Sequence, residues 1–332
     1  MTTRHFVNEP EDVTREALEG LQLLYPDALV CHTDPTFVVR AGERPSKVAL
    51  VSGGGAGHEP LHARFVGTGM LDAAVPGAVF SSPTAFQVRS AIETVDTGHG
   101  TLLIVKNYTG DILNFSIAAE LLDGDRAVEM VVVDDDLATD DLAPDGPGRR
   151  GTAAVVAVEK ICGAAAERGD TLREVADLGR RVVASSSTLG VALRAGTPPG
   201  HSRPSFELGE NEIEFGVGIH GERGRGTRPL TPVHELIDDL VGQLVAAGRI
   251  ASGDDAIAIV NGLGATHELE LAIAARELAR ALDRRGIGHA RLIAGSFVTS
   301  FDMHGLSITL VRAADDLLEL WDAPVRTPAL TW

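Results

Sequence analysis

The first half of the sequence alternates short apolar runs with helically spaced apolar positions. Four runs rich in Val, Leu and Ala predict strands buried on both faces: Val48 to Val51, Ala74 to Phe80, Leu102 to Val105 and Val128 to Val133. Helical spacing predicts helices over residues 11–24, Pro83 to Val95, Asp111 to Leu122, Thr152 to Arg168 and Leu172 to Ala184. Ser82 followed by Pro83 predicts the start of the second helix. Strands that alternate with helices predict a doubly wound, mostly parallel sheet.

After residue 185 the predicted strands lie closer together in the sequence. They cover Leu189 to Leu193, Glu212 to Ile219, Ala256 to Val260, Ala290 to Gly295 and Leu306 to Val311. Helices are predicted over Pro232 to Ala247, His267 to Leu282 and Ala314 to Trp321. This change predicts two α/β domains, residues 1–185 and residues 186–332, the second with a mixed sheet and flanking helices.

Composition narrows the class of protein. The 332 residues are 44% hydrophobic and 23% charged, a balance typical of globular proteins. The formal net charge of -18 argues against nucleic acid and anionic membranes as partners, because both are polyanions that attract Lys and Arg. No window approaches eighteen consecutive apolar residues and the N-terminal segment has no apolar signal core, so we expect a cytoplasmic protein without a membrane span. Cys31 and Cys162 lack metal-ligand spacing and are expected to be free thiols.

The segment Val48 to Pro60, VALVSGGGAGHEP, runs an apolar strand into four glycines and a histidine. A buried strand that opens into such a loop is typical of a ligand site, since glycine lets the backbone approach a ligand closely. No Lys and hydroxyl pair follows Gly57, which excludes a P-loop, and His58 occupies the third glycine position of the dinucleotide motif. The letters H-E-x-x-H occur at His58 to His62, but Pro60 prevents one helix from carrying both histidines, so we expect no metal site.

Three predicted strands of the first half end in polar residues. His58 follows the first strand, Ser81 follows the second, and Lys106 and Asp111 follow the third. The carboxyl ends of parallel strands meet at one edge of the sheet, where open α/β folds bind ligands. We therefore expect these four side chains in one crevice. A structural alternative is that Lys106 binds a backbone carbonyl and Asp111 caps the following helix.

In the second half, a predicted strand leads into His220, which lies between Gly218 and Gly221. A lone histidine is more often a structural hydrogen-bonding residue, but this setting leaves the imidazole open and suits a nucleophile or a ligand contact. The remaining histidines lack this setting. They are interpreted as surface or packing residues, with an allowance for His62 because it lies near the glycine loop.

Six segments resemble one protein family and follow its order along nearly the whole chain. They are GGGAGHEP at Gly53 to Pro60, VKNYTGDILNF at Val105 to Phe115, EFGVGIHGE at Glu214 to Glu222, VNGLGAT at Val260 to Thr266, SFDMHGLSITL at Ser300 to Leu310 and LWDAPVRTPA at Leu320 to Ala329. Through these segments the sequence resembles the substrate-binding subunit of dihydroxyacetone kinases, the DhaK family.

The resemblance implies roles for the residues singled out above. His220 is expected to bind the ketone carbon of the substrate covalently as a hemiaminal, and His58 is expected to assist by acid/base or hydrogen-bonding help. Lys106 and Asp111 are expected to bind the substrate hydroxyls, and Asp111 to take the proton of the hydroxyl that receives the phosphate. The glycine-loop residues expected to line the same pocket are Gly55, Ala56, Gly57 and His58.

The same resemblance implies what the chain works with. The substrate is expected to be dihydroxyacetone or another short ketose, and the chain itself is expected to bind no cofactor. An adenine nucleotide with magnesium is expected on a separate DhaL-type subunit. That nucleotide would be recharged from phosphoenolpyruvate through a phosphotransferase-system protein or would exchange with free ATP. The family also suggests a homodimer.

The sequence departs from the family pattern at three places. Ala56 stands where serine is common, Arg223 stands where proline is common, and the stretch between Gly226 and Gly253 is shorter. The first two departures leave open a C4 ketose such as erythrulose as the substrate. The main alternative function is a non-catalytic ketose sensor that regulates a transcription factor, although a sensor needs no base. A third alternative, a sugar-phosphate aldolase or isomerase, needs a Schiff-base lysine, which the acidic, glycine-rich surroundings of Lys106 do not suggest.

Overall fold

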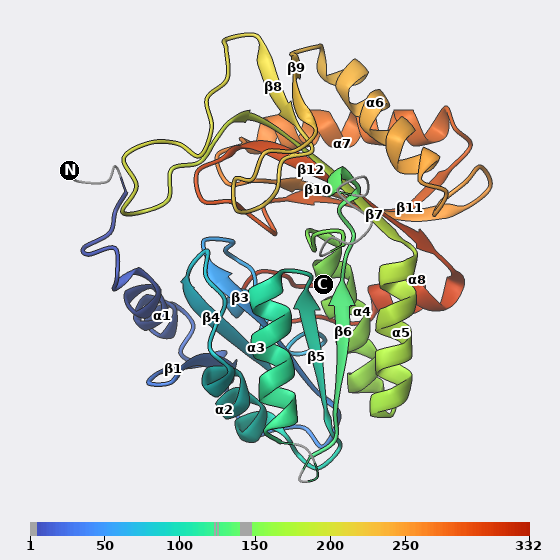
Figure 1. Cartoon of the computed structure of the whole chain (residues 1–332). Coiled ribbons are helices and arrows are strands. Elements are labelled where there is room, and N and C mark those ends of the chain that lie inside the picture. Colours follow the sequence, from blue (N-terminus) through green and yellow to red (C-terminus); the bar gives the residue numbers. More distant parts are fainter. Residues whose placement is uncertain (1–4, 123, 125, 140–147) are drawn as a thin grey trace.

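A computed structural model of the chain describes residues 5–122, 124, 126–139 and 148–332. The described residues form two six-stranded sheets, each with helices packed against it (Figure 1). The first sheet contains β1 (Leu29–Thr33), β2 (Thr36–Arg40), β3 (Ala49–Ala56), β4 (Ala73–Val79), β5 (Thr101–Lys106) and β6 (Val128–Val133) in the order β1-β2-β4-β3-β5-β6. Strands β4, β3, β5 and β6 are parallel, and the β1–β2 hairpin adds antiparallel strands at one edge.

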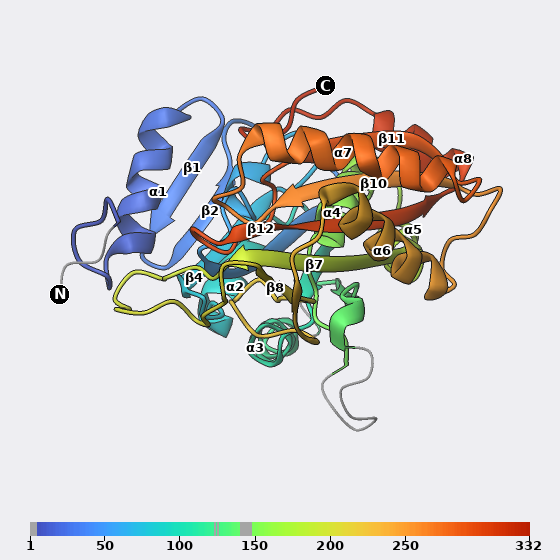
Figure 2. The same cartoon turned by 90° about the horizontal axis from the view of Figure 1, so that it is seen from above.

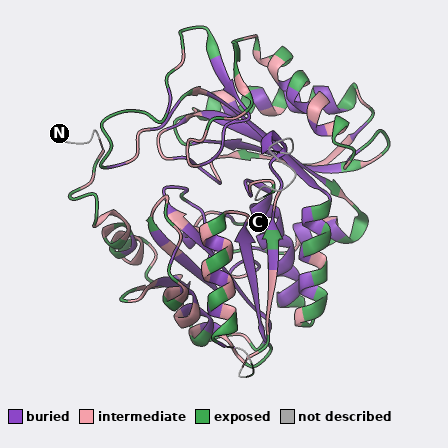
Figure 3. Ribbon diagram, viewed as in Figure 1, coloured by how far each residue is buried: buried purple, intermediate pink, exposed green. Residues whose placement is uncertain are grey.

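Helices cover both faces of the first sheet, as the alternating pattern predicts. They are α1 (Val13–Leu24), α2 (Ala85–Val95), α3 (Thr109–Glu120), α4 (Ala154–Arg168) and α5 (Leu172–Ala184). Val51 and Leu103 pack with α2 and α3, whereas Leu50 and Ile104, their neighbours along β3 and β5, pack with α1, α4 and α5. Because successive side chains of a strand point to opposite faces, these strands are buried on both sides. Figure 3 shows this burial along the strands. The doubly wound first sheet is thus confirmed.

The second sheet is mixed, as predicted. It contains β7 (Ser186–Arg194), β8 (Glu212–Phe215), β9 (Gly226–Pro229), β10 (Asp255–Gly262), β11 (Gly288–Gly295) and β12 (His304–Ala313) in the order β11-β10-β12-β7-β8-β9. Only the β10–β11 pair among these is parallel. Helices α6 (Val233–Ala246) and α7 (Glu268–Asp283) cover its outer face, which Figure 2 views from above. Helix α8 (Asp315–Asp322) packs against α4.

The two sheets share one hydrophobic core through α4. Ile257, Ile259 and Val311 of the second sheet belong to the same buried cluster as the side chains of α4, which also packs against the first sheet. After α8 the chain returns to the first sheet, where Arg326 donates its backbone N–H to Thr68. This shared core fixes loops from the two halves relative to each other. The chain passes from α5 to β7 at Ser185, and the division into two domains there stays a prediction.

Several element ends differ from the sequence predictions. The β1–β2 hairpin and β9 were not predicted. Helix α2 begins after Thr84, not at Ser82 and Pro83, because Thr84 and Gln87 form a capping box that satisfies the first backbone N–H groups. Strand β8 ends at Phe215, not Ile219, because Gly216 has a φ of 77° that leaves the extended conformation. In the part of the chain that the structure describes, no helix is long and apolar enough to cross a membrane.

Candidate active site

The predicted glycine loop is the last part of strand β3, which extends to Ala56 instead of ending at Val51, because Gly53, Gly54 and Gly55 pair with β4. This part of the strand leaves no room for side chains. A Cβ atom at Gly54 would lie 2.7 Å from Lys106 Nζ and 3.4 Å from Asp111 Oδ2. A Cβ atom at Gly55 would lie 2.5 Å from the backbone nitrogen of Ser81. These close approaches explain why glycine occupies the positions, since any larger residue would collide with the neighbouring strand ends. The loop therefore brings the ends of β3, β4 and β5 together.

His58 follows this loop and is almost completely buried. Its Nδ1 lies 2.8 Å from the carbonyl oxygen of Thr299, so Nδ1–H donates to that carbonyl and Nε2 carries the lone pair. Nε2 is buried and has no hydrogen-bond partner among the described residues. The pKa of His58 lies well below its usual range, mainly because the ring is buried and further because His220 and Lys106 lie nearby. His58 is consequently a neutral imidazole with an available acceptor atom.

His220 reaches the same place from the second half of the chain. Its ring lies 4.7 Å from the ring of His58, 4.5 Å from Tyr108 and 5.4 Å from Phe80, measured between ring centroids. The side chain is 21% exposed. Its Nδ1 lies 3.1 Å from Glu222 Oε1, and its backbone N–H donates to Glu222 Oε2 at 3.0 Å. With Nδ1–H donated to this carboxylate, Nε2 keeps its lone pair.

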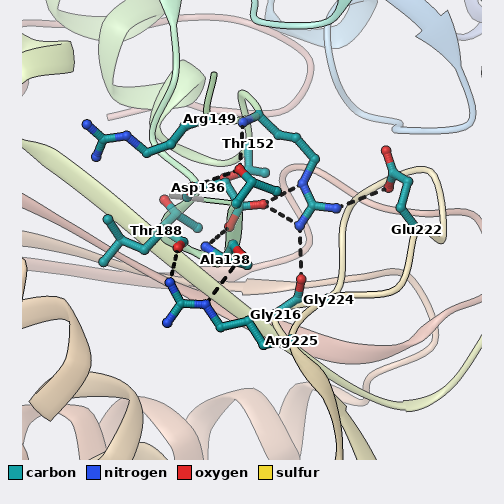
Figure 4. Close-up of polar contacts among 12 residues, drawn as sticks. Asp136, Ala138, Arg149, Thr152, Thr188, Gly216, Glu222, Gly224 and Arg225 are labelled. Atoms are coloured by element: carbon teal, nitrogen blue, oxygen red, sulfur yellow. Dashed lines mark hydrogen bonds and ion pairs between the residues drawn. The ribbon is translucent and has the colours of Figure 1, made fainter. Parts of the chain in front are cut away.

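Glu222 is itself held by an arginine that links both halves (Figure 4). The Arg150 guanidinium binds Asp136 at 2.7 Å, the carbonyl oxygen of Gly216 at 2.9 Å and Glu222 at 3.9 Å. Burial alone would raise the pKa of Glu222, but the hydrogen bond from His220 and the charge of Arg150 lower it to about 2. Glu222 is therefore ionised at neutral pH and accepts hydrogen bonds from the ring and the backbone N–H of His220 as a carboxylate.

Lys106 and Asp111 lie at the end of β5 and the start of α3, and both are buried. Lys106 Nζ donates to the carbonyl oxygen of Gly53 at 3.2 Å and to His62 Nε2 at 2.8 Å. Burial lowers the pKa of Lys106, and the opposite charges of Asp111 and Glu159 act against that shift. Asp111 Oδ1 is buried without a hydrogen-bond partner in the part of the chain that the structure describes, which weighs against a purely helix-capping role.

The other predicted residues line this cluster to different extents. Ser81 is exposed and its hydroxyl donates to Val79 at 3.4 Å, so its backbone and not its side chain adjoins the loop. Ala56 ends β3, and the Gly57 N–H donates to the carboxylate of Glu59. Residues 58–62 form a turn and not an α-helix. Within the described ranges, no three His, Cys, Asp or Glu side chains gather to hold a metal ion.

Sequence reasoning missed several residues around the cluster. Phe80 and Tyr108 contact the His220 ring edge to face, and both lie next to residues that were predicted, so strand-end position was a usable signal. Thr299 comes from a distant loop and had no local signal. His62 was interpreted as a surface or packing residue with an allowance for a role near the glycine loop. In the structure it is buried and hydrogen-bonds to both Lys106 and Glu159.

Two cavities of similar volume lie in different parts of the fold, one beside the glycine loop and the other away from His58 and His220. A cavity of about 220 Å³ lies between α1 and the glycine loop, and Gly54, Gly55, Ala56, Gly57 and Glu59 help to line it. A more apolar one of about 240 Å³ lies between β7, β12, α6 and α7, away from His58 and His220. We place the site at the histidine cluster and not at the more apolar cavity, because the buried unpartnered polar atoms gather there.

Two imidazoles, an ammonium group and a carboxylate meet where two α/β sheets face each other, which defines a binding protein for a small polar ligand. Comparison with known proteins gives the family: the chain belongs to the Dak1 domain family, which it matches over residues 19–329. It is 44% identical to the dihydroxyacetone-binding subunit DhaK of the PEP-dependent dihydroxyacetone kinase of Escherichia coli strain K12, covering 99% of both chains.

Solved structures support the same assignment. The dihydroxyacetone kinase of C. freundii matches with a TM-score of 0.91 and 35% identity over 98% of this chain and 60% of that chain. The dihydroxyacetone kinase operon co-activator DhaQ matches with a TM-score of 0.89 and 32% identity over 97% of this chain and 98% of that chain. A kinase and a co-activator therefore have this fold in common.

Proposed function

We propose that this chain is the dihydroxyacetone-binding subunit of a dihydroxyacetone kinase and presents the ketose to a separate nucleotide-bearing subunit of the DhaL type. The observation that carries the proposal is the pair of imidazoles, His58 and His220, whose rings lie 4.7 Å apart beside Lys106 and Asp111. Its similarity to the E. coli subunit, whose name gives dihydroxyacetone as the ligand, supports the same substrate.

Capture begins at His220. Nε2 attacks the ketone carbon, an N–C bond forms, and the π electrons of the carbonyl move to its oxygen. The oxygen gains a proton and the imidazole loses its Nδ1 proton, so the hemiaminal is neutral. Ionised Glu222 stabilises the positive charge that develops on the ring. His58, whose Nε2 is unpartnered, accepts a hydrogen bond from the new hydroxyl.

Covalent capture selects a ketone over a polyol. Glycerol offers hydroxyl groups but no electrophilic carbon, so it cannot form the bond to His220. Lys106 and Asp111 then hold the hydroxyl groups of the captured ketose. Asp111 takes the proton of the hydroxyl that attacks the phosphoryl group, while the nucleotide and magnesium come from the partner subunit.

Glu222→Gln should weaken ketose capture roughly fivefold while leaving the fold intact. The amide can still accept the Nδ1–H of His220, but a hydrogen bond to a neutral group is weaker than one to a charged group by about 1 kcal/mol. Ketose affinity measured by isothermal titration calorimetry checks this expectation. Glu270→Gln is the matched control, because Glu270 binds His304 at 3.0 Å away from the site. Equal losses in both variants would contradict the role given to Glu222.

The kinase proposal is tested with a panel of short ketoses, a purified DhaL-type subunit and ATP or phosphoenolpyruvate. The chain alone should phosphorylate neither dihydroxyacetone nor erythrulose, and addition of the partner should restore phosphorylation of at least one. Because the net charge is -18, association with an electropositive partner surface should weaken with salt as charges are screened over about 10 Å. Phosphorylation with MgATP and no partner would overturn the two-component proposal.

The similarity to the operon co-activator favours one second candidate, a ketose sensor that acts on a transcription regulator. A sensor needs capture by His220 but no base at Asp111. Tight ketose binding together with failure to support phosphorylation by any DhaL-type partner would favour the sensor over the kinase.

A further inference from the structure

A chain of buried polar groups begins at Lys106 and continues through His62 to Glu159. Lys106 Nζ lies 2.8 Å from His62 Nε2, and His62 Nδ1 lies 2.6 Å from Glu159 Oε1. All three side chains are at least 94% buried. Glu159 comes from α4 and Lys106 from the end of β5, so the chain connects the shared core with the glycine loop. Nothing in the chemistry derived above uses His62 or Glu159.

The geometry fixes where the imidazole proton of His62 lies. The Lys106 ammonium has only donors, so His62 Nε2 must accept and carry the lone pair. The proton is then on Nδ1, where Glu159 Oε1 accepts it and the hydroxyl of Ser52 lies 3.0 Å away. Ser52 gives its own proton to the carbonyl oxygen of Ile104, which leaves its lone pairs free to accept. Glu159 and Ser52 thus stabilise one tautomer.

This arrangement decides where the third donor of Lys106 points. One N–H goes to the carbonyl oxygen of Gly53 and one to His62. We propose that His62 and Glu159 are positioning residues that hold Lys106 as a directed donor, with its remaining N–H available to a hydroxyl group of the captured ketose. The inference rests on the proposed function, because it takes Lys106 as a ligand contact.

The charges around the chain make its effect depend on pH. Asp111, Glu159, His58 and His62 surround Lys106, and burial raises the pKa of Glu159 to about 8 while Lys106 and Ser52 oppose the shift. Below that pH Glu159 is neutral but Oε1 still accepts from His62. Above it the carboxylate is ionised and helps to keep Lys106 protonated. Glu159→Gln keeps the acceptor and removes the titration, so it separates hydrogen bonding from charge.

The first experiment reads the tautomer directly. Long-range ¹H–¹⁵N spectra of histidine-labelled full-length protein, with the His62 signals assigned by their loss in His62→Asn, should show a neutral ring protonated at Nδ1 from pH 6 to 8. A ring protonated at Nε2, or a doubly protonated ring, would overturn the proposal. This result does not depend on whether the protein binds a ketose.

The second experiment measures dihydroxyacetone affinity by calorimetry between pH 6 and 10. His62→Leu should weaken binding roughly tenfold, since Lys106 loses an acceptor that orients it. At pH 7, Glu159→Gln should bind dihydroxyacetone as tightly as the wild type does. As the pH is raised, the affinity of the variant should begin to fall at a lower pH than that of the wild type, because loss of the negative charge lowers the pKa of Lys106. A merely structural role would give no such displacement.

Asp72→Asn is the matched control for these variants. Asp72 binds Lys47 at 2.5 Å as another buried carboxylate partner of a lysine in the first sheet, away from the glycine loop. It should lower the melting temperature and leave the pH dependence of ketose binding unchanged. The proposal would be overturned if His62→Leu bound dihydroxyacetone with wild-type affinity. It would also be overturned if the affinity of Glu159→Gln fell at the same alkaline pH as that of the wild type. Failure of the wild type to bind any ketose would instead contradict the proposed function.

Discussion

His220→Ala should abolish covalent capture of dihydroxyacetone and leave the fold intact. The ring is partly exposed, and its contacts are to the rings of His58, Phe80 and Tyr108 and to Glu222; of these only Tyr108 packs against the hydrophobic core. Without an imidazole no N–C bond can form with the ketone carbon, and the hydrogen bonds of Lys106 and Asp111 remain as the only means of holding the ligand.

Crystals soaked with dihydroxyacetone give the measurement. The wild type should show continuous density from an imidazole nitrogen to the ketone carbon, and His220→Ala should show none. His304→Ala is the control, because His304 also pairs with a glutamate on the surface but lies away from the cluster. Ligand density that is unconnected to an intact His220 in the wild type would contradict the covalent proposal.

The positions of His58, Lys106 and Asp111 were predictable because one rule of sheet geometry applies to them. Parallel strands end at the same edge, so residues that follow β3 and β5 must lie near each other. Apolar runs and glycines marked those strand ends in the sequence. Ser81 shows the limit of the rule, since it follows β4 as predicted but its hydroxyl turns back to Val79. Strand order places a residue and does not orient its side chain.

The rest of the site depends on packing between elements that are distant in the sequence. His58 and His220 meet because the two sheets share α4, and the residues of α4 read only as a buried helix. Thr299, which sets the tautomer of His58, lies in a loop 241 residues further on. Glu159 is one of several charged residues in its predicted helix, and nothing in the sequence indicates its contact with His62.

The missed fold elements have local causes. Strands β1 and β2 are five residues each and carry His, Thr and Arg among their apolar residues, so the alternation was too short to stand out. Strand β9 is four residues long and mostly exposed, and of the strands that the structure describes it pairs only with β8, at the edge of the sheet. Elements without a buried face leave little periodicity in the sequence, whereas β6 and α5, which pack on the core, were predicted with their observed bounds.

Asp111→Asn should keep ketose binding but slow phosphoryl transfer by roughly 10²- to 10⁴-fold, the range expected for loss of a general base. The amide matches the carboxylate in size and can still accept a hydrogen bond from a hydroxyl group. It cannot take a proton at neutral pH, so the attacking hydroxyl of the ketose loses its base while the captured hemiaminal on His220 forms as before. Steady-state kinetics with a DhaL-type partner, compared with calorimetric ketose affinity, separate the two effects.

The competing explanation is that Asp111 only stabilises the start of α3, where a carboxylate interacts favourably with the helix dipole. That explanation predicts a lower melting temperature with unchanged turnover, and Asp315→Asn in the first turn of α8 provides the matched comparison. The buried, unpartnered Oδ1 of Asp111 argues for the catalytic role, because a capping carboxylate would be expected to accept backbone N–H groups. Slow transfer with intact binding in Asp111→Asn, and neither effect in Asp315→Asn, is the result that only a base beside the ketose explains.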